Sequence, residues 1–83
     1  MNDKYKLNNF DEFKFSMDVR MDIEFYLRGI RYNISWRDYK PFICVCPDGD
    51  AVFFEDADDL LLNYTVDGVP LKELWREMDI ISM

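Results

Sequence analysis

The amino-acid sequence predicts an α+β fold, in which an antiparallel sheet carries helices on one face. The chain has 83 residues, which is the length of one domain. Apolar residues first recur at helical spacing and then alternate with polar residues, as in half-buried strands. The segments between the alternating runs are too short for parallel crossovers. We therefore expect residues 1–83 to form a single domain with an N-terminal helix, a meander of three to four strands and two short C-terminal helices packed on one face.

The first predicted element is a helix over residues 8–21, "NNFDEFKFSMDVRM". Asn8 or Asn9 is a suitable N-cap, because its side chain can accept a hydrogen bond from an unpaired N–H of the first turn. Acidic residues follow in that turn, where the helix dipole favours them. The apolar stripe of this helix consists of Phe10, Phe13, Met17 and Met21.

A β-hairpin is predicted over residues 22–36, with its turn at Arg28-Gly29. Such a turn pairs the apolar residues across the two strands: Leu27 with Ile30, Phe25 with Tyr32, and Ile23 with Ile34. Every apolar residue then lies on one face, and a shift of one residue would destroy this agreement. The glycine supplies the positive φ that a two-residue turn requires.

Two further strands are predicted after the hairpin. The run "FICVC" (42–46) is apolar on both faces, which is typical of a central strand. The turn signal "PDGD" (47–50) leads into a short strand, "AVFF" (51–54). We expect Cys44 and Cys46 to be small buried residues with free thiols, because two residues apart in one strand their Cβ atoms point the same way.

The stretch "VFFEDADDLLL" (52–62) places four carboxylates between two apolar runs. We expect Asp56 to cap a short helix whose first turn holds further carboxylates, close to unpaired N–H groups. A turn at Asp67-Gly68 and Pro70 at the first helical position then predict a last helix. Its buried stripe consists of Leu71, Leu74, Trp75 and Met78.

The acidic residues are concentrated in the second half of the chain. The net charge is −7. Residues 1–47 contain seven acidic and eight basic residues, whereas residues 48–83 contain ten acidic residues against Lys72 and Arg76. Such an excess repels nucleic acid and attracts basic surfaces. We therefore expect no direct binding to nucleic acid. No stretch has the roughly 18 apolar residues of a membrane span, so no membrane contact is expected either.

The composition favours a binding role over an enzymatic one. The chain contains no histidine, so a Ser-His or Cys-His pair is impossible within one subunit. Zinc normally needs four Cys or His ligands. Calcium binding by carboxylates and glycosidase chemistry stay open as alternatives, although the spacing of the EF-hand loop is absent. We expect no catalytic residue, no metal and no cofactor.

Three stretches carry a family resemblance: "FDEF", "DIEFYLRGIRYNISW" and "FEDADDLLLNYTVDGVPLKELWREMDI". They resemble small, mostly uncharacterised proteins of bacterial phages and mobile elements. Acidic proteins of that origin are often similar to inhibitors of host defence, anti-CRISPR proteins among them. The resemblance implies a protein that blocks an effector nuclease in the cytoplasm of the host cell. It implies no catalytic residues.

The leading functional hypothesis is an anti-CRISPR-like inhibitor that presents a carboxylate-rich face to a basic nucleic-acid groove, as a mimic of DNA. A duplex carries one negative charge per roughly 1.7 Å of axis, so a dense acidic face could compete for such a groove. The predicted partner-binding residues are Asp48, Asp50, Glu55, Asp56, Asp58, Asp59, Asp67 and Tyr64. Tyr26 and Tyr39 are further candidate anchors.

Two alternatives remain open. The acidic cluster could serve helix capping and solubility alone. The domain could instead be a structural or regulatory interaction module that forms a homodimer, through a sheet edge or the aromatic side of the hairpin. The chain could thus be a monomer or a homodimer.

Overall fold

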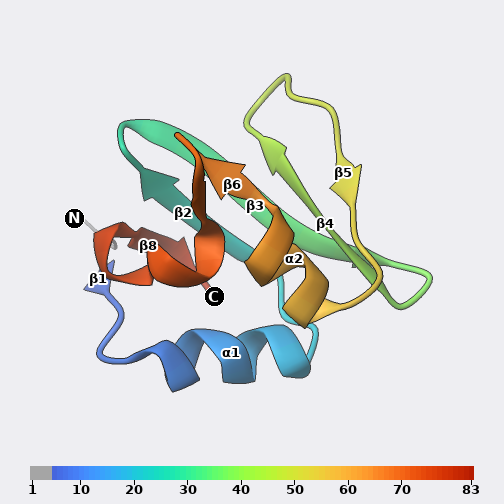
Figure 1. Ribbon diagram of the computed structural model, residues 1–83, viewed down its shortest axis with the longest axis horizontal. Coiled ribbons are helices and arrows are strands. Elements are labelled where there is room, and N and C mark those ends of the chain that lie inside the picture. The colour runs from blue at the N-terminus through green and yellow to red at the C-terminus, as the bar shows by residue number, and fades with distance from the viewer. Residues whose placement is uncertain (1–4) are drawn as a thin grey trace.

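The computed structural model describes residues 5–83 and confirms an α+β fold with an antiparallel sheet (Figure 1). In spatial order its six strands are β1 (Tyr5–Lys6), β8 (Asp79–Ser82), β2 (Ile23–Leu27), β3 (Ile30–Arg37), β4 (Lys40–Val45) and β5 (Val52–Phe53). A separate small hairpin joins β6 (Thr65–Val66) to β7 (Val69–Pro70). The helical elements are α1 (Phe10–Asp18), α2 (Ala57–Asn63) and two 3-10 turns, η1 (Leu71–Glu73) and η2 (Trp75–Glu77). Residues 1–4 of the polar N-terminal stretch lie outside the described residues.

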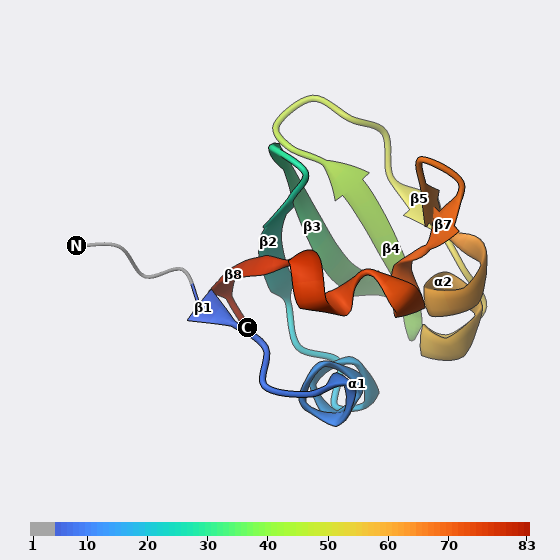
Figure 2. The same cartoon turned by 60° about the vertical axis from the view of Figure 1, so that its left-hand side comes forward.

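The helical elements and the sheet enclose one apolar core. Figures 1 and 2 show α2 and the 3-10 turns in front of the sheet, with α1 below it. The core is formed by fully buried side chains of these layers, among them Phe13, Phe25, Ile43, Leu60 and Leu71. The opposite face of the sheet carries no helix among the described residues. Polar and half-buried side chains of the central strands therefore face solvent there.

The predicted hairpin forms with the predicted register. Ile23 pairs with Ile34, Phe25 with Tyr32, and Leu27 with Ile30. Arg28 has a φ of 53° and Gly29 a φ of 80°, as expected for a tight hairpin turn with two left-handed residues. The rings of Phe25 and Tyr32 stack with their centroids 5.4 Å apart. The apolar residues that pair across the two strands are therefore also in direct side-chain contact on the core side, as the rings of Phe25 and Tyr32 show.

The first helix is shorter than predicted. Asn9 is its N-cap and accepts a hydrogen bond from the Glu12 N–H at 2.9 Å. The helix ends at Asp18, because Arg20 adopts the left-handed conformation with a φ of 59°. Phe13 and Met17 are buried as expected, but Met21 lies beyond the helix and is 40% exposed. The prediction that Met21 belongs to the buried stripe was wrong.

The C-terminal segment differs most from the prediction. The expected last helix is replaced by η1 and η2. Leu71, Leu74 and Met78 are buried as predicted, but Trp75 is only half-buried, so its place in the buried stripe was wrong. The chain then forms β8, which lies between β1 and β2 and pairs antiparallel with both. The tight 3-10 turns keep the apolar side chains on the core side and return the chain to the sheet edge. The sheet therefore has six strands instead of the predicted three to four.

Both cysteines lie in or next to β4 with free thiols, as expected, but neither is fully buried. Cys44 pairs with Asn33 across to β3 and belongs to the helix-free face of the sheet. Partial burial raises the pKa of the Cys44 thiol, so the thiol stays protonated at neutral pH. The expectation of fully buried cysteines was wrong, because the helices cover the other face.

We expect Ile80→Ala to destabilise the protein by about 2–5 kcal/mol, the usual cost of removing a fully buried Ile side chain. Ile80 is 0% exposed and pairs with Phe25. The matched control is Ile30→Ala, since Ile30 is 44% exposed and should cost about 1 kcal/mol or less. Urea denaturation followed by circular dichroism measures both. Equal losses in the two variants would contradict the placement of β8 inside the sheet.

Candidate protein-binding surface

Six of the predicted acidic residues lie on the stretch of chain that runs from the end of β4, through the edge strand β5, to the first turn of α2. Two lie in the loop between β4 and β5, two directly follow β5, and two lie in the first turn of α2. We call this set the acidic edge: Asp48, Asp50, Glu55, Asp56, Asp58 and Asp59. The chain from Asp50 to Glu55 spans about 17 Å when extended. Acidic residues thus lie both before and after β5 along the chain.

The loop that carries Asp48 and Asp50 is held close to the end of β4. The Gly49 N–H donates a hydrogen bond of 2.7 Å to the Val45 carbonyl oxygen. A Cβ on Gly49 would lie 2.6 Å from that same oxygen, so only glycine fits. Asp48 and Asp50 themselves are exposed and make no ion pair or side-chain hydrogen bond with residues 5–83. Their charges are fully available to solvent or to a partner.

At the start of α2, local hydrogen bonds already use two of the carboxylates. Asp56 is the N-cap and accepts from the Asp59 N–H at 2.8 Å. Asp59 accepts from the Glu55 N–H at 2.9 Å and from the Asn63 side chain at 2.6 Å. These bonds lower the pKa of Asp59, so it stays ionised well into the acidic range. Hydrogen bonds at the start of α2 therefore explain the presence of Asp56 and Asp59 in the acidic edge.

Two other carboxylates of the acidic edge form ion pairs with lysines. Glu55 contacts the Lys40 ammonium at 2.6 Å, and Asp58 contacts the Lys14 ammonium at 3.4 Å. The carboxylate side chains are 74% and 71% exposed. Exposed pairs of this kind contribute little to stability and exchange readily with other partners. The edge is therefore partly neutralised, and its strongest unbalanced charge lies at Asp48 and Asp50.

The remaining two predicted residues lie away from the acidic edge. Asp67 lies in the turn between β6 and β7, where it contacts Arg28 at 3.0 Å. Arg28 also holds both oxygens of Glu77, at 2.8 and 3.0 Å, which lowers the pKa of Glu77. Tyr64 is half-buried, and its ring packs edge-on against those of Tyr32 and Phe54. The structure thus ties Asp67 and Tyr64 to the fold itself.

The basic side chains of residues 5–83 are all engaged within the protein. Lys6, Lys14, Arg28, Arg31 and Lys40 form ion pairs with carboxylates. Arg20, Arg37, Lys72 and Arg76 instead lie over aromatic rings. Contacts of both kinds hold the cations near the protein surface. The cations keep their charge in these contacts, and the acidic excess comes from their smaller number, ten against seventeen carboxylates in the sequence.

The sequence analysis missed an aromatic cluster on the helix-free face beside the acidic edge. Phe42 and Phe53 are paired across β4 and β5, with ring centroids 5.0 Å apart. The Arg37 guanidinium lies over both rings, at 6.0 and 5.8 Å. The alternation of "FICVC" and the turn at "PDGD" would have placed both Phe side chains on this face. Apolar side chains of Phe42 and Phe53 therefore lie next to the acidic residues that precede and follow β5.

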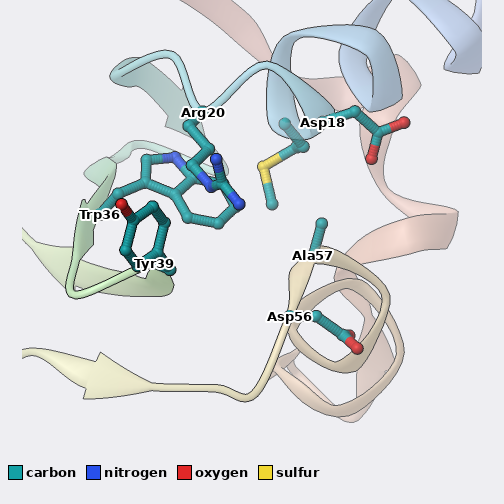
Figure 3. A pocket seen from close by; sticks show the side chains of 7 residues that line it. Asp18, Arg20, Trp36, Tyr39, Asp56 and Ala57 are labelled. Atoms are coloured by element: carbon teal, nitrogen blue, oxygen red, sulfur yellow. The ribbon is translucent and has the colours of Figure 1, made fainter.

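A cleft of about 160 Å³ lies between the end of α1, the turn from β3 to β4 and the start of α2. Figure 3 shows Arg20, Trp36 and Tyr39 on one side of the cleft, while the carboxylates of Asp18 and Asp56 point away from these rings. Arg20 lies 4.9 Å from the centre of the Tyr39 ring. Of the three tyrosines considered as anchors, Tyr39 is the exposed one, at 78%.

No three His, Cys, Asp or Glu side chains of residues 5–83 are arranged to hold a metal ion. Within the same part of the chain, no helix has the length and apolar character needed to cross a membrane.

The capping and charge roles of Asp56 can be separated by substitution. We expect Asp56→Ala to lower the free energy of unfolding by about 0.5–2 kcal/mol, because the Asp59 N–H loses its partner. Asp56→Asn should retain most of the stability, since an amide oxygen also caps a helix. Urea denaturation at neutral pH compares the two variants. Equal destabilisation by both would show that the charge of Asp56, rather than its cap bond, stabilises α2.

Searches against protein-family models, curated proteins and solved structures found no match.

Proposed function

We propose that the protein is a non-enzymatic binding protein that inhibits a nucleic-acid-processing partner by covering a basic surface of that partner. One observation carries the proposal. The lysines and arginines of residues 5–83 are engaged by the protein's own carboxylates and rings, whereas Asp48 and Asp50 are exposed and have no such partner. A net charge of −7 on so small a surface attracts and orients cationic partners.

An effector nuclease of a CRISPR system is the partner class that we propose first. Such an enzyme holds duplex DNA and a guide heteroduplex in positively charged channels. The carboxylates before and after β5 would contact the basic side chains that line such a channel. The expected resemblance to proteins of phages and mobile elements would imply the same partner class.

The charge density of the acidic edge favours occupation of a groove over close imitation of DNA. A duplex of about 17 Å would carry about ten phosphate charges. The stretch from Asp50 to Glu55, which spans the same length when extended, carries only these two carboxylates, and Glu55 contacts Lys40. We therefore propose mixed contacts, in which carboxylates bind Arg and Lys of the partner. Tyr39, beside the cleft, could add an aromatic contact of the kind found in binding hot spots.

Charge reversal of Asp48 and Asp50 tests the proposal. The double variant Asp48→Lys/Asp50→Lys should weaken inhibition of DNA cleavage by guide-loaded effector nucleases by about tenfold or more. Inhibition by the unmodified protein should also fall when salt is raised from about 0.05 to about 0.3 M, because exposed charges are then screened. A DNA cleavage assay on a panel of purified effectors, with the inhibitor added before DNA, gives both readouts.

The matched control is Asp11→Lys/Glu73→Lys. Both residues are exposed, lie outside the acidic edge and change the net charge by the same amount. This control should retain inhibition if the position of the charge matters. Equal loss in both double variants would mean that net charge alone acts. Failure of the unmodified protein to inhibit any effector in the panel would refute the proposed partner class.

A homodimeric interaction module is the second candidate, and one observation favours it. Phe15 and Val19 lie one helical turn apart at the C-terminal half of α1 and are 65% and 49% exposed. Exposed apolar residues at this spacing could pair with the same surface of a second copy.

Light scattering across a dilution series tests this second candidate. A homodimer through α1 should dissociate on Phe15→Ser, because a large contact side chain is lost. It should persist in Leu62→Ser, since Leu62 is 53% exposed but lies on α2. A monomer at every concentration of the unmodified protein would contradict the candidate.

A further inference from the structure

The edge strand β5 has an open side. It comprises Val52 and Phe53, pairs with β4 and is the last strand of the sheet. Figure 1 shows β5 at the margin of the sheet, with no further strand beside it. Val52 and Phe53 are each 44% exposed. Edge strands present unpaired N–H and C=O groups, which can template the addition of another strand.

The hydrogen-bond register shows which backbone groups point outward. The Phe54 N–H donates to the Pro41 carbonyl oxygen at 2.9 Å, so these two residues form a hydrogen-bonded pair. Hydrogen-bonded and non-hydrogen-bonded pairs alternate along an antiparallel ladder. The next pair, Phe42 with Phe53, is therefore of the non-hydrogen-bonded kind. The N–H and C=O of Phe53 consequently point away from β4, toward the open side.

The side chains around β5 define the chemistry that would suit this edge. Phe53 and Phe42 offer an apolar surface on the helix-free face, partly covered by Arg37. Carboxylates lie at both ends of the strand, with Asp50 before it and Glu55 after it. An incoming strand would therefore meet an apolar centre, bordered by Arg37, between the unpaired carboxylate of Asp50 and that of Glu55, for which it would compete with Lys40. Basic side chains about five residues apart on that strand would lie opposite Asp50 and Glu55.

A second copy of the same chain does not suit this edge. If Phe53 of two copies paired about a two-fold axis, antiparallel register would bring Asp50 opposite Asp56 of the other copy. Like charges directly opposite one another destabilise a strand pair. A register shifted by two residues brings Asp48 opposite Asp56 instead. The acidic residues thus protect the edge against self-association and leave it open to a basic strand.

We propose that the open edge of β5 binds an extended segment of the partner protein, one with alternating apolar residues and a Lys or Arg near each end. The segment would add an antiparallel strand to the sheet, bonded through the N–H and C=O of Phe53. This inference rests on the proposed function, since it names the part of the partner that the acidic edge would contact. It adds a backbone contact that charge attraction alone does not require.

An NMR titration of the full chain tests the inference with a defined probe. The probe is the acetylated and amidated peptide Lys-Thr-Val-Thr-Val-Lys, and its control is Glu-Thr-Val-Thr-Val-Glu. The lysine peptide should bind, shift the amide signal of Phe53 and slow its hydrogen exchange at least about fivefold. The glutamate peptide should not bind. Binding of the lysine peptide without protection of the Phe53 amide would overturn the inference.

A pair of variants isolates the backbone contact. Phe53→Pro and Phe53→Ala both lose the ring, but only proline also removes the outward N–H, and an edge strand tolerates it there. Phe53→Pro should bind the lysine peptide at least about fivefold more weakly than Phe53→Ala. Equal affinities would overturn the inference. Should Phe53→Pro fail to fold, the exchange measurement on the unmodified chain decides.

The test of strand addition at β5 and the test of nuclease inhibition can give different results, so each proposal can fail without the other. Loss of nuclease inhibition in Asp48→Lys/Asp50→Lys, together with equal inhibition by the two Phe53 variants, would keep the function and refute strand addition. Protection of the Phe53 amide by the lysine peptide, without inhibition of any effector, would support the edge site and refute the proposed partner class.

Discussion

The fold depends on a sheet that buries one of its two faces. Each central strand directs alternate residues to the core, so the register of the β2–β3 hairpin fixes which side chains meet α2, η1 and η2. Ile23, Phe25 and Ile34 are fully buried on that face. A slip of one residue would exchange these side chains for Glu24, Asn33 and other polar groups. The turn at Gly29 and the burial of these side chains together permit only one register of the β2–β3 hairpin.

One-sided coverage also determines where a partner can bind. The helices and 3-10 turns occupy the core side, which leaves the opposite face and the β5 edge open. The polypeptide places its most acidic stretch along this edge, on the path from β4 to α2. Asp56 and Asp59 serve α2 through hydrogen bonds at its N-terminus, and Asp48 and Asp50 in the loop between β4 and β5 do not. Residues 48–59 thus contain both carboxylates that stabilise α2 and carboxylates that only add negative charge to the surface.

Much of this fold could be predicted from the sequence, because its signals are local. The turn at Arg28-Gly29, the N-cap at Asp56 and the turn at Asp67-Gly68 each depend on neighbouring residues, and each formed as expected. The strand β8 depends instead on pairing with β2, about fifty residues earlier, and four residues give a weak periodic signal. Helical spacing in Leu71, Leu74 and Met78 is also compatible with two 3-10 turns, so the pattern alone favoured the wrong element.

The candidate site could be predicted only in part, for the same reason. The sequence showed that acidic residues outnumber local needs and that six of them lie between the end of β4 and the first turn of α2. It could not show that Arg28 reaches Asp67 and Glu77 from a distant turn. Nor could it show that Tyr64 lies between Tyr32 and Phe54. Long-range partners decide which charges and rings remain available to another molecule.

The position of β8 has a consequence for how the native state opens. Among residues 5–83, β1 joins the sheet through β8 alone. Any fluctuation that detaches β8 from β2 therefore also releases β1, and the two ends of the described chain form one cooperative unit. Since their pairing joins residues more than seventy positions apart, closing this unit carries a large loop-entropy cost and should come late in folding.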